Sequence, residues 1–231
     1  MVTEAELQNL MTTGLKTYFH DSFLTHENID TAVTQTAAAY KYVTQLLLST
    51  GVLQDSEARA NYDRSFFNPR YGKLSIKARL NSMDDLTMFM GFKGTLAVPA
   101  WGMTEACAGL LIDNKNDPGV LYFYTGNGSA LHPAYQATPI MDIDMTRWLI
   151  YEIEFNRFRR YSLPFIVPYF DKNVEDKLKE GLSRKWSERT TNGSTLPADE
   201  MQYIMFYITN NVGTTKTMDV QHVTYSEVYP D

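Results

Sequence analysis

Four carboxylates flank one tryptophan in residues 141–155, MDIDMTRWLIYEIEF, and could supply the acid and base of a glycoside hydrolase. Asp142 and Asp144 precede the tryptophan, and Glu152 and Glu154 follow it. Residues two apart on a strand are separated by roughly 6.6 Å. Retaining glycosidases hold their two carboxyl groups about 5 to 5.5 Å apart, and inverting ones hold them further apart. Spacing alone therefore leaves an acid–base pair open.

The pattern around these acids favours the solvated faces of two ordinary strands. Glu152 and Glu154 share one face with Ile150, while apolar residues alternate with them on the other face. Neither pair has a further acidic residue along its strand, and no cleft rich in aromatic residues can be assigned beside either pair. We therefore interpret the carboxylates as surface groups, and we predict no catalytic residue and no enzymatic activity.

The other reactive residues form no catalytic motif in the sequence. The histidines are scattered, without an HxxxH or HxH pair, and neither a G-x-S-x-G elbow nor a Gly-rich phosphate loop occurs. Cys107 is the sole cysteine, which excludes a disulfide within the chain, and its small and apolar neighbours predict a buried thiol. We expect no cofactor.

Residues 113–117, DNKND, place oxygen ligands at alternate positions, as Ca²⁺ prefers. Asp113 and Asp117 are therefore weak candidates for metal ligands. The later Glu of a helix–loop–helix Ca²⁺ site is absent, and Pro118 and Gly119 follow at once. We interpret the stretch as an Asx-rich turn between two strands and predict no metal site.

The composition is that of a globular protein with a sizeable core. The chain has 231 residues, of which 44% are hydrophobic, and Tyr, Phe and Met are plentiful. Its net charge of −6 argues against a nucleic-acid-binding surface, which needs clustered Lys and Arg. No stretch has the form of a signal peptide, and no apolar run is long enough to span a membrane. We expect a protein assembled in a cytoplasm, without nucleic-acid or membrane partners.

Strand patterns dominate the chain. The clearest lies in residues 72–82, where apolar residues alternate with polar ones. Further strands are predicted in residues 83–94, 119–128, 148–155, 160–170, 201–209 and 215–228, with weaker ones in 18–25 and 42–53. Residues 37–48 could also be helical. Many short strands with almost no βαβ alternation predict an all-β fold, an antiparallel β-sandwich or jelly roll.

Two short helices are expected beside this sandwich. Residues 1–16 form an N-terminal docking arm, and residues 17–231 form the β-sandwich domain. The helix of the arm has an apolar stripe made of Leu7, Leu10 and Met11. An insertion at about residues 171–200 contains a second amphipathic helix and Trp186, which could anchor an interface.

Several stretches resemble, in order and spacing, those of one known superfamily. Residues 19–25, FHDSFLT, resemble its opening F-x-D-x-F strand. Residues 72–82 resemble its alternating strand with an arginine, and residues 84–92, DDLTMFMGF, resemble the x-F-x-G-F strand after it. Residues 146–155, TRWLIYEIEF, precede FIVPYFD as in the family, and residues 201–228 resemble its terminal pair of strands.

These stretches resemble the concanavalin A-like lectin/glucanase superfamily, including its laminin-G-like branch, over about residues 18–170 and 196–229. The resemblance implies a two-sheet jelly roll. Glucanases of the superfamily carry an E-x-D-x-(x)-E strand, but here Glu154 stands where the family has Asp, and Asn156 follows it. The catalytic assignment is therefore not carried over. The chain resembles the non-catalytic branch, which includes lectin-like modules and structural proteins of tailed phages and archaeal viruses.

Two functions follow from this resemblance. The first is a structural or decorating component of a virus particle, assembled in the host cytoplasm, with capsid proteins and further copies of the chain as partners. Its expected interface residues are Leu7, Leu10, Met11 and Trp186. The alternative is a lectin-like module, in which aromatic rings stack on a glycan beside a few polar groups. Its candidate residues are the platforms Trp101, Tyr122, Tyr124 and Tyr135, with Asp113 and Asn127 as polar partners.

Overall fold

The computed structural model describes residues 15–21, 29–34, 37–42, 45–62, 67–69, 72–140, 143–156, 161–168 and 200–228. The predicted helices lie outside these residues, as do Asp142 and the expected interface residues Leu7, Leu10, Met11 and Trp186. All regular elements of the described part are strands, and none of its residues forms a helix long and apolar enough to cross a membrane.

The described strands form two sheets. Sheet A contains β1 (Leu15–Asp21), β3 (Ala38–Tyr42), β4 (Gln45–Ser49), β6 (Gly72–Leu80), β11 (Leu149–Asn156), β12 (Tyr161–Pro168) and β14 (Thr217–Val228). Sheet B contains β2 (Ile29–Val33), β5 (Glu57–Tyr62), β7 (Leu86–Lys93), β8 (Cys107–Asp113), β9 (Leu121–Gly126), β10 (Tyr135–Ile140) and β13 (Tyr203–Asn210).

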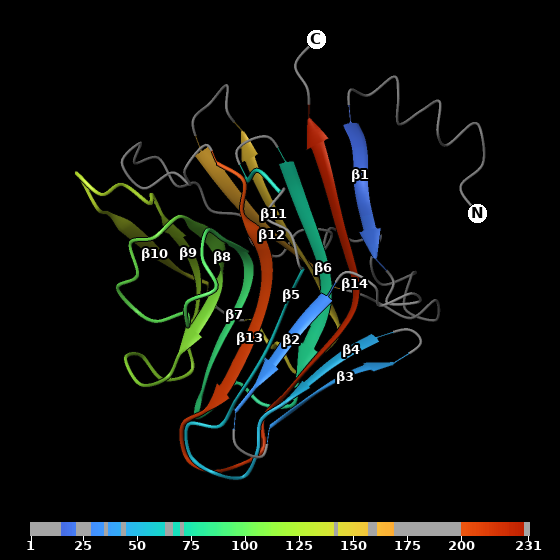
Figure 1. Ribbon diagram of the computed structural model, residues 1–231, viewed down its shortest axis with the longest axis vertical. Coiled ribbons are helices and arrows are strands. Elements are labelled where there is room, and N and C mark those ends of the chain that lie inside the picture. Colours follow the sequence, from blue (N-terminus) through green and yellow to red (C-terminus); the bar gives the residue numbers. More distant parts are fainter. Residues whose placement is uncertain are drawn as a thin grey trace.

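The strand order interleaves distant parts of the chain. Sheet A runs β12-β11-β6-β14-β4-β3, with β1 paired to the last part of β14, and sheet B runs β10-β9-β8-β7-β13-β5-β2. The pairings between these strands are antiparallel. The sheets face each other, and the start of β1 lies beside the end of β14 (Figure 1). This arrangement confirms the predicted antiparallel β-sandwich.

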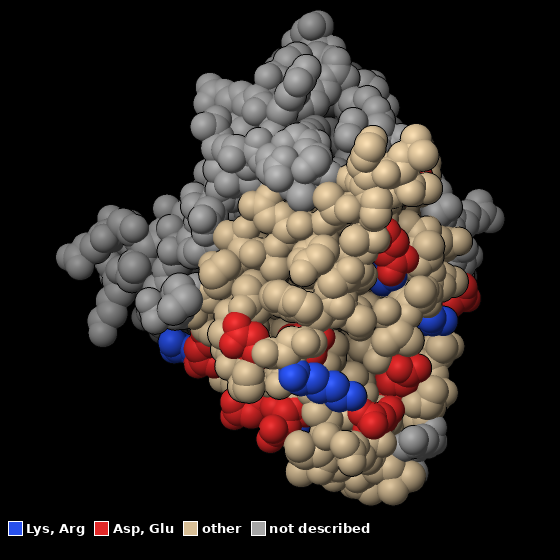
Figure 2. All heavy atoms as spheres, turned by 90° about the vertical axis from the view of Figure 1, so that its left-hand side faces the viewer, with Lys and Arg blue, Asp and Glu red and all other residues tan. Residues whose placement is uncertain are grey.

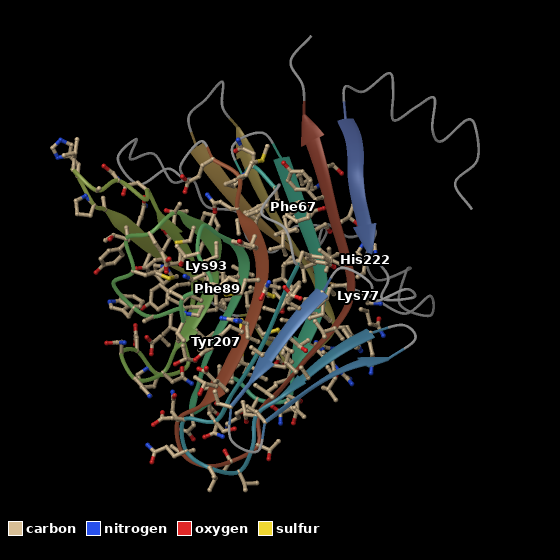
Figure 3. The ribbon with its side chains drawn as sticks, viewed as in Figure 1. Phe67, Lys77, Phe89, Lys93, Tyr207 and His222 are labelled. Atoms are coloured by element: carbon tan, nitrogen blue, oxygen red, sulfur yellow. The ribbon has the colours of Figure 1, made fainter. Side chains whose placement is uncertain are left out.

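The main apolar core fills the space between the sheets (Figure 3). On β6, the predicted alternation is confirmed, because its apolar side chains are at most 2% exposed: Leu74, Ile76, Ala78 and Leu80. On β7, alternate residues from Leu86 to Phe92 enter the same core from sheet B. Period-two alternation thus fixes which face of each sheet is buried.

Five strands were not predicted from the sequence: β2, β3, β5, β8 and β10. All residues of β8 are buried, so CAGLLID shows no alternation. β5, EARANY, contains residues that are uncommon in strands, and only Ile29 of β2 is buried. Pro139 lies on β10, an edge strand, where proline is tolerated. The helical alternative for residues 37–48 is wrong, because β3 and β4 form a hairpin there.

A second apolar layer covers the outer face of sheet B. Its buried side chains point away from the main core: Phe89, Cys107, Leu111, Tyr124, Met205 and Tyr207. Residues 94–106 connect β7 to β8, and we call them the strap. The strap packs Leu96, Trp101 and Met103 against this layer. A sheet surface that would otherwise face solvent thereby becomes a small second core.

Candidate functional site

Three tyrosines share the outward face of sheet B near its β10 edge. Tyr124 lies opposite Gly109 on β8 and opposite Ala137 on β10. Tyr122 is two residues away on β9, and Tyr135 is two residues away from Ala137 on β10, so both point to the same side as Tyr124. Period two and the strand register together bring side chains from two strands into one group.

Gly109 makes room for the ring of Phe89, which belongs to the same buried layer as Tyr124. A Cβ atom at Gly109 would lie 2.6 Å from Cζ of Phe89 and 2.7 Å from the carbonyl oxygen of Met90. Carbon atoms in contact stay about 3.5–4.0 Å apart. The ring of Phe89 therefore occupies the space above Gly109, within the same buried layer as Tyr124.

Trp101 of the strap completes the aromatic group. Its ring centroid is 4.8 Å from that of Tyr122, 6.1 Å from that of Tyr124 and 6.4 Å from that of Tyr135, all at steep angles. The rings of Tyr124 and Tyr135 are stacked, 5.4 Å apart and inclined by 5°. These are the favoured geometries of aromatic pairs. We call Trp101, Tyr122, Tyr124 and Tyr135 the aromatic platform; the structure brings together all four residues that the sequence analysis singled out.

The four rings differ in their exposure to solvent. Tyr124 is fully buried and Tyr122 is 8% exposed, whereas Tyr135 is 40% exposed and Trp101 is partly exposed. The hydroxyl of Tyr124 donates to the carbonyl oxygen of Met103 at 3.0 Å. The hydroxyl of Tyr122 donates to the carboxylate of Asp117. Trp101 and Tyr135 are thus the accessible part of the platform.

The surroundings of the two inner tyrosines keep them protonated. Burial, together with the hydrogen bond to Asp117, raises the pKa of Tyr122 to about 12. Burial also raises the pKa of Tyr124 above its ordinary value. Both phenols therefore act as hydrogen-bond donors at neutral pH, and their donor capacity is already used within the protein.

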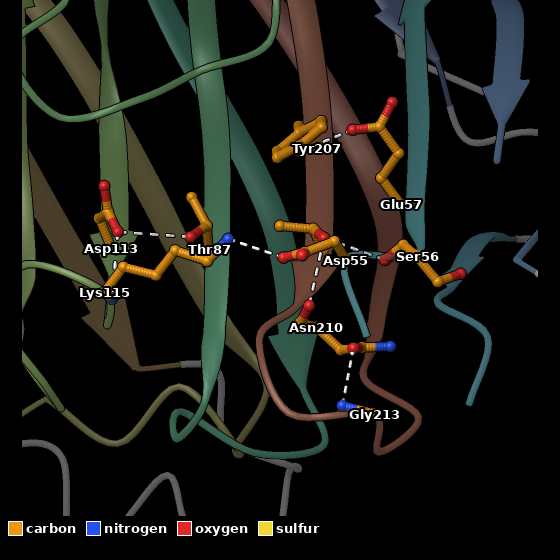
Figure 4. Close-up of polar contacts among 10 residues, drawn as sticks. Asp55, Ser56, Glu57, Thr87, Asp113, Lys115, Tyr207, Asn210 and Gly213 are labelled. Carbon is orange, nitrogen blue, oxygen red and sulfur yellow. Dashed lines mark hydrogen bonds and ion pairs between the residues drawn. The ribbon is translucent and has the colours of Figure 1, made fainter. Parts of the chain in front are cut away.

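Asp113 fixes the strap to sheet B. Its carboxylate is almost fully buried and accepts four hydrogen bonds. Oδ2 accepts from the backbone N–H of Trp101 at 3.1 Å and from Nδ2 of Asn116 at 2.8 Å. Oδ1 accepts from the backbone N–H of Lys115 at 3.2 Å and from Oγ1 of Thr87 at 3.4 Å (Figure 4). Asp113 is therefore not a free polar partner for a ligand.

The turn after β8 uses its oxygens internally. Asp113 and Asp117 accept hydrogen bonds from N–H and O–H donors, and Oδ1 of Asn114 accepts from the backbone N–H of Gly119 at 2.9 Å. In the part of the chain that the structure describes, no group of three or more His, Cys, Asp or Glu residues could hold a metal ion. Residues 113–117 thus form the predicted Asx-rich turn between β8 and β9.

Asn127 shapes the loop that precedes Tyr135. Its Oδ1 accepts from the backbone N–H groups of Ser129 at 3.1 Å and Ala134 at 3.0 Å, and its Nδ2 donates to the carbonyl oxygen of His132 at 2.8 Å. Asn127 thus closes the β9–β10 loop. These contacts assign its side-chain atoms to the loop, and its expected role as a polar partner of a ligand stays a prediction.

Both ends of the strap are held by groups that the sequence analysis missed. Lys93 is fully buried and forms an ion pair with Glu105, and Glu105 also accepts from the hydroxyl of Thr95. Farther along, Nη1 of Arg59 donates to the carbonyl oxygen of Leu96 at 2.6 Å. A lysine within the apolar strand LTMFMGFK was the available signal, since such a residue needs a buried partner.

Cys107 lies beneath the strap. Its side chain is fully buried, which confirms the predicted buried thiol. Burial raises the pKa of Cys107 to about 12, while Lys93 opposes the shift. Because the reactive form of cysteine is the thiolate, this residue is chemically inert at neutral pH.

Two of the four carboxylates around Trp148, those of Glu152 and Asp144, are engaged within the protein. Glu152 forms an ion pair of 2.7 Å with Lys73 on the outer face of sheet A, on the other side of the sandwich. Asp144 accepts from the backbone N–H and the hydroxyl of Thr146, at 3.0 and 2.6 Å, and these bonds lower its pKa. The side chain of Glu154 lies outside the described part. Glu152 and Asp144 therefore have structural partners.

Two carboxylates on the platform side of sheet B, Asp55 and Glu57, have partners within the protein. Nζ of Lys115 lies 2.7 Å from Oδ1 of Asp55, and Tyr207 donates to Glu57 at 2.9 Å (Figure 4). Viewed from the β10 side, most charged side chains gather in the lower half of the described surface, and the upper half is largely uncharged (Figure 2).

No family model matches the chain, and no curated protein matches it. Solved structures do resemble it. SCLam, a non-specific endo-β-1,3(4)-glucanase from family GH16, is 10% identical with a TM-score of 0.62, covering 94% of this chain and 92% of that one. The laminarinase catalytic domain from Thermotoga maritima MSB8 is 10% identical with a TM-score of 0.60, covering 94% and 99%. Arcelin-5, a lectin-like defense protein from Phaseolus vulgaris, is 12% identical with a TM-score of 0.59, covering 92% and 98%.

These similarities establish the concanavalin A-like fold, and they correct one prediction. Glycoside hydrolases share the fold over more than nine-tenths of both chains. The missing acid motif was therefore not a sufficient reason to predict that the protein is no enzyme. That prediction considered Glu152 on sheet A, whereas Glu57 and Glu105 are acids on the platform side of sheet B.

Proposed function

We propose that the protein binds neutral glycans through the aromatic platform, with Trp101 and Tyr135 as the contact residues. The observation that carries the proposal is the exposed ring of Tyr135, which is stacked on Tyr124 and packed against Trp101. A ring fixed in this way presents a rigid apolar surface to the face of a pyranose. Little conformational entropy is then lost on binding.

The roles of the four rings follow from their contacts. Tyr122 and Tyr124 are buried and their hydroxyls are engaged, so they support the other two rings. The hydroxyl of Tyr135 has no hydrogen-bond partner among the described residues, and it remains available to a sugar hydroxyl. The neighbouring charges of Lys93, Glu105 and Lys115 are paired within the protein. This favours an uncharged ligand, because these three charges are already neutralised within the protein.

The test is a glycan array followed by calorimetry with the best ligand. We expect Tyr135→Ala and Trp101→Ala to weaken binding by about tenfold or more, because stacking on an aromatic ring contributes on the order of 1–3 kcal/mol. Trp148→Ala is the matched control. Trp148 lies on the outer side of sheet A, with Cζ of Arg79 at 4.7 Å and Nζ of Lys77 at 5.5 Å from its ring centroid.

Salt dependence separates a neutral ligand from a charged one. Binding of a neutral glycan should be unchanged between about 0.05 and 0.5 M salt, because screening acts only on charge–charge attraction. Array binding restricted to acidic glycans, or equal losses in the platform variants and in Trp148→Ala, would overturn the proposal. Since hydrolases share the fold, each ligand is also incubated with the protein and analysed for newly formed reducing ends.

The second candidate function is a component of a virus particle, assembled in the host cytoplasm. An exposed apolar tip favours it: Val52, Leu53 and Val212 are 64%, 51% and 51% exposed at the end of the sandwich where the β4–β5 and β13–β14 loops meet. Apolar side chains gathered at one tip suit attachment to another protein or to a second copy.

Size-exclusion chromatography with light scattering tests this candidate on the full chain. We expect self-association that rises with concentration and is lost in Leu53→Asp. Val98→Asp is the matched control, because Val98 is equally exposed, at 51%, but lies on the strap. A monomer at all concentrations that also fails to bind virion proteins would rule the role out.

A further inference from the structure

We propose that Asp113 is the positioning residue of the platform: its buried carboxylate sets the place of Trp101 and thereby the affinity for a glycan. This proposal rests on the proposed function for its effect on affinity. Its structural part, the link between Asp113 and Trp101, can be tested without any ligand.

The contacts of Asp113, the last residue of β8, join β7 and the turn after β8 to the strap. Thr87 belongs to β7, Lys115 and Asn116 belong to the turn after β8, and Trp101 belongs to the strap. Of the hydrogen bonds that hold the strap in the described structure, the bond to Asp113 is made at Trp101 itself. The Arg59 bond holds Leu96, the Lys93 pair holds Glu105 and the hydroxyl of Tyr124 holds Met103, each at a different residue of the strap.

The chemistry of the site requires a carboxylate at residue 113. The four donors converge on two oxygens, and each oxygen faces a backbone N–H that cannot turn away: Trp101 on one side and Lys115 on the other. An asparagine at this position would have one oxygen and one NH₂ group. In either orientation its NH₂ would face one of the two backbone N–H groups, so that two donors would oppose each other. Burial makes such a mismatch costly.

The turn after β8 also holds the ring of Tyr122, and this contact tolerates a change from aspartate to asparagine. Asp117 accepts a single hydrogen bond from the hydroxyl of Tyr122. Asp117→Asn keeps an oxygen that can accept this bond, so Tyr122 stays in place. Asp113→Asn and Asp117→Asn therefore make the same chemical change, four residues apart in one turn, with opposite expected effects on the platform.

The experiment uses the full chain with fluorotryptophan in place of its tryptophans and records fluorine NMR spectra. The Trp101 signal is assigned as the one missing in Trp101→Phe. We expect this signal to shift or broaden in Asp113→Asn and to stay unchanged in Asp117→Asn. Glycan affinity is expected to fall about tenfold in Asp113→Asn, which corresponds to roughly 1.4 kcal/mol, and to be retained in Asp117→Asn.

The possible outcomes separate the two proposals. An unchanged Trp101 signal in Asp113→Asn overturns the positioning role, as does a moved signal with unchanged affinity. If the unmodified protein binds no glycan, the proposed function fails, and the Trp101 signal alone decides whether Asp113 sets the place of the ring.

If Asp113→Asn does not fold, a measurement on the unmodified protein still tests the proposal. The amide hydrogen of Trp101, donated to a buried carboxylate, should exchange with solvent much more slowly than that of Gly102, the next residue of the strap. Equal exchange rates at these two positions would contradict the proposal.

Discussion

Burial near the strap raises the pKa of individual side chains. The Cys107 thiol is fully enclosed and has a pKa of about 12, against an ordinary value of 9.0. Tyr122 has a pKa of about 12, against an ordinary value of 10.0. In both cases the folded protein holds a proton that the unfolded chain releases at lower pH. Alkaline pH therefore favours unfolding.

We predict that the free energy of unfolding falls as the pH rises above about 9, where an exposed thiol begins to ionise, and that the fall continues to about pH 12. In Cys107→Ala the decline should begin only near pH 10, where the unfolded tyrosines ionise. Urea denaturation at a series of pH values measures this. A Cys107→Ala protein with the same decline between pH 9 and 10 would show that the thiol is not responsible.

The composition of the platform could be predicted from the sequence, but its support could not. Tyr122 and Tyr124 alternate on one strand, which places both on one face whatever the fold. The contact between Arg59 and Leu96 joins residues that only strand register and the path of the strap bring together. Asp113 was predicted as a ligand contact because its type suggested an open acceptor; the structure shows its oxygens in use.

At the scale of elements, β8 supports the strap because Gly109, at the centre of this strand, has no side chain. Gly109 lets β7 present Phe89 over β8, and the strap packs on the layer that results. The sequence could not indicate β8 as a strand, since a fully buried run of small and apolar residues has no alternation. Burial on both faces removes the alternation from the sequence of β8, and it also allows the second apolar layer to form on the outer face of this strand.

We predict that Gly109→Ala destabilises the protein by about 1–3 kcal/mol, the usual cost of overpacking a core. The added methyl group would meet the ring of Phe89 and the carbonyl oxygen of Met90. Urea denaturation gives the change in the free energy of unfolding.

A double-variant cycle with Phe89→Leu identifies the contact responsible. The smaller side chain should relieve part of the strain, giving a coupling of at least about 0.5 kcal/mol between the two changes. A Gly109→Ala protein as stable as the unmodified one would refute the close packing of β7 on β8.

At the scale of the whole molecule, the two outer faces of the sandwich are separate surfaces. Sheet A carries paired charges such as Lys73–Glu152 and Arg79–Asp219, and sheet B carries the strap and the platform. The core between them buries side chains from both sheets. Changes on one outer face should therefore have little effect on the other.

Glu152→Gln tests this separation. We expect a loss of at most about 1 kcal/mol in the free energy of unfolding, the usual range for an ion pair near the surface, and unchanged glycan binding. Combined with Tyr135→Ala, the two effects on stability should add, as expected for distant sites. Weaker binding in Glu152→Gln, or loss of any glycan cleavage in that variant, would move the functional site to sheet A.

The positions of β13 and β14 have a consequence for biosynthesis. β13 lies between β7 and β5 in sheet B, and β14 joins β6 to β4 and β1 in sheet A, yet both follow all other described strands in the sequence. While the ribosome is still extending the chain, neither sheet has its inner strand, and strands with open edges invite pairing with other chains. Acquisition of the native state must therefore wait until residues 203–228 have left the exit tunnel, which makes the nascent polypeptide a natural client for chaperones.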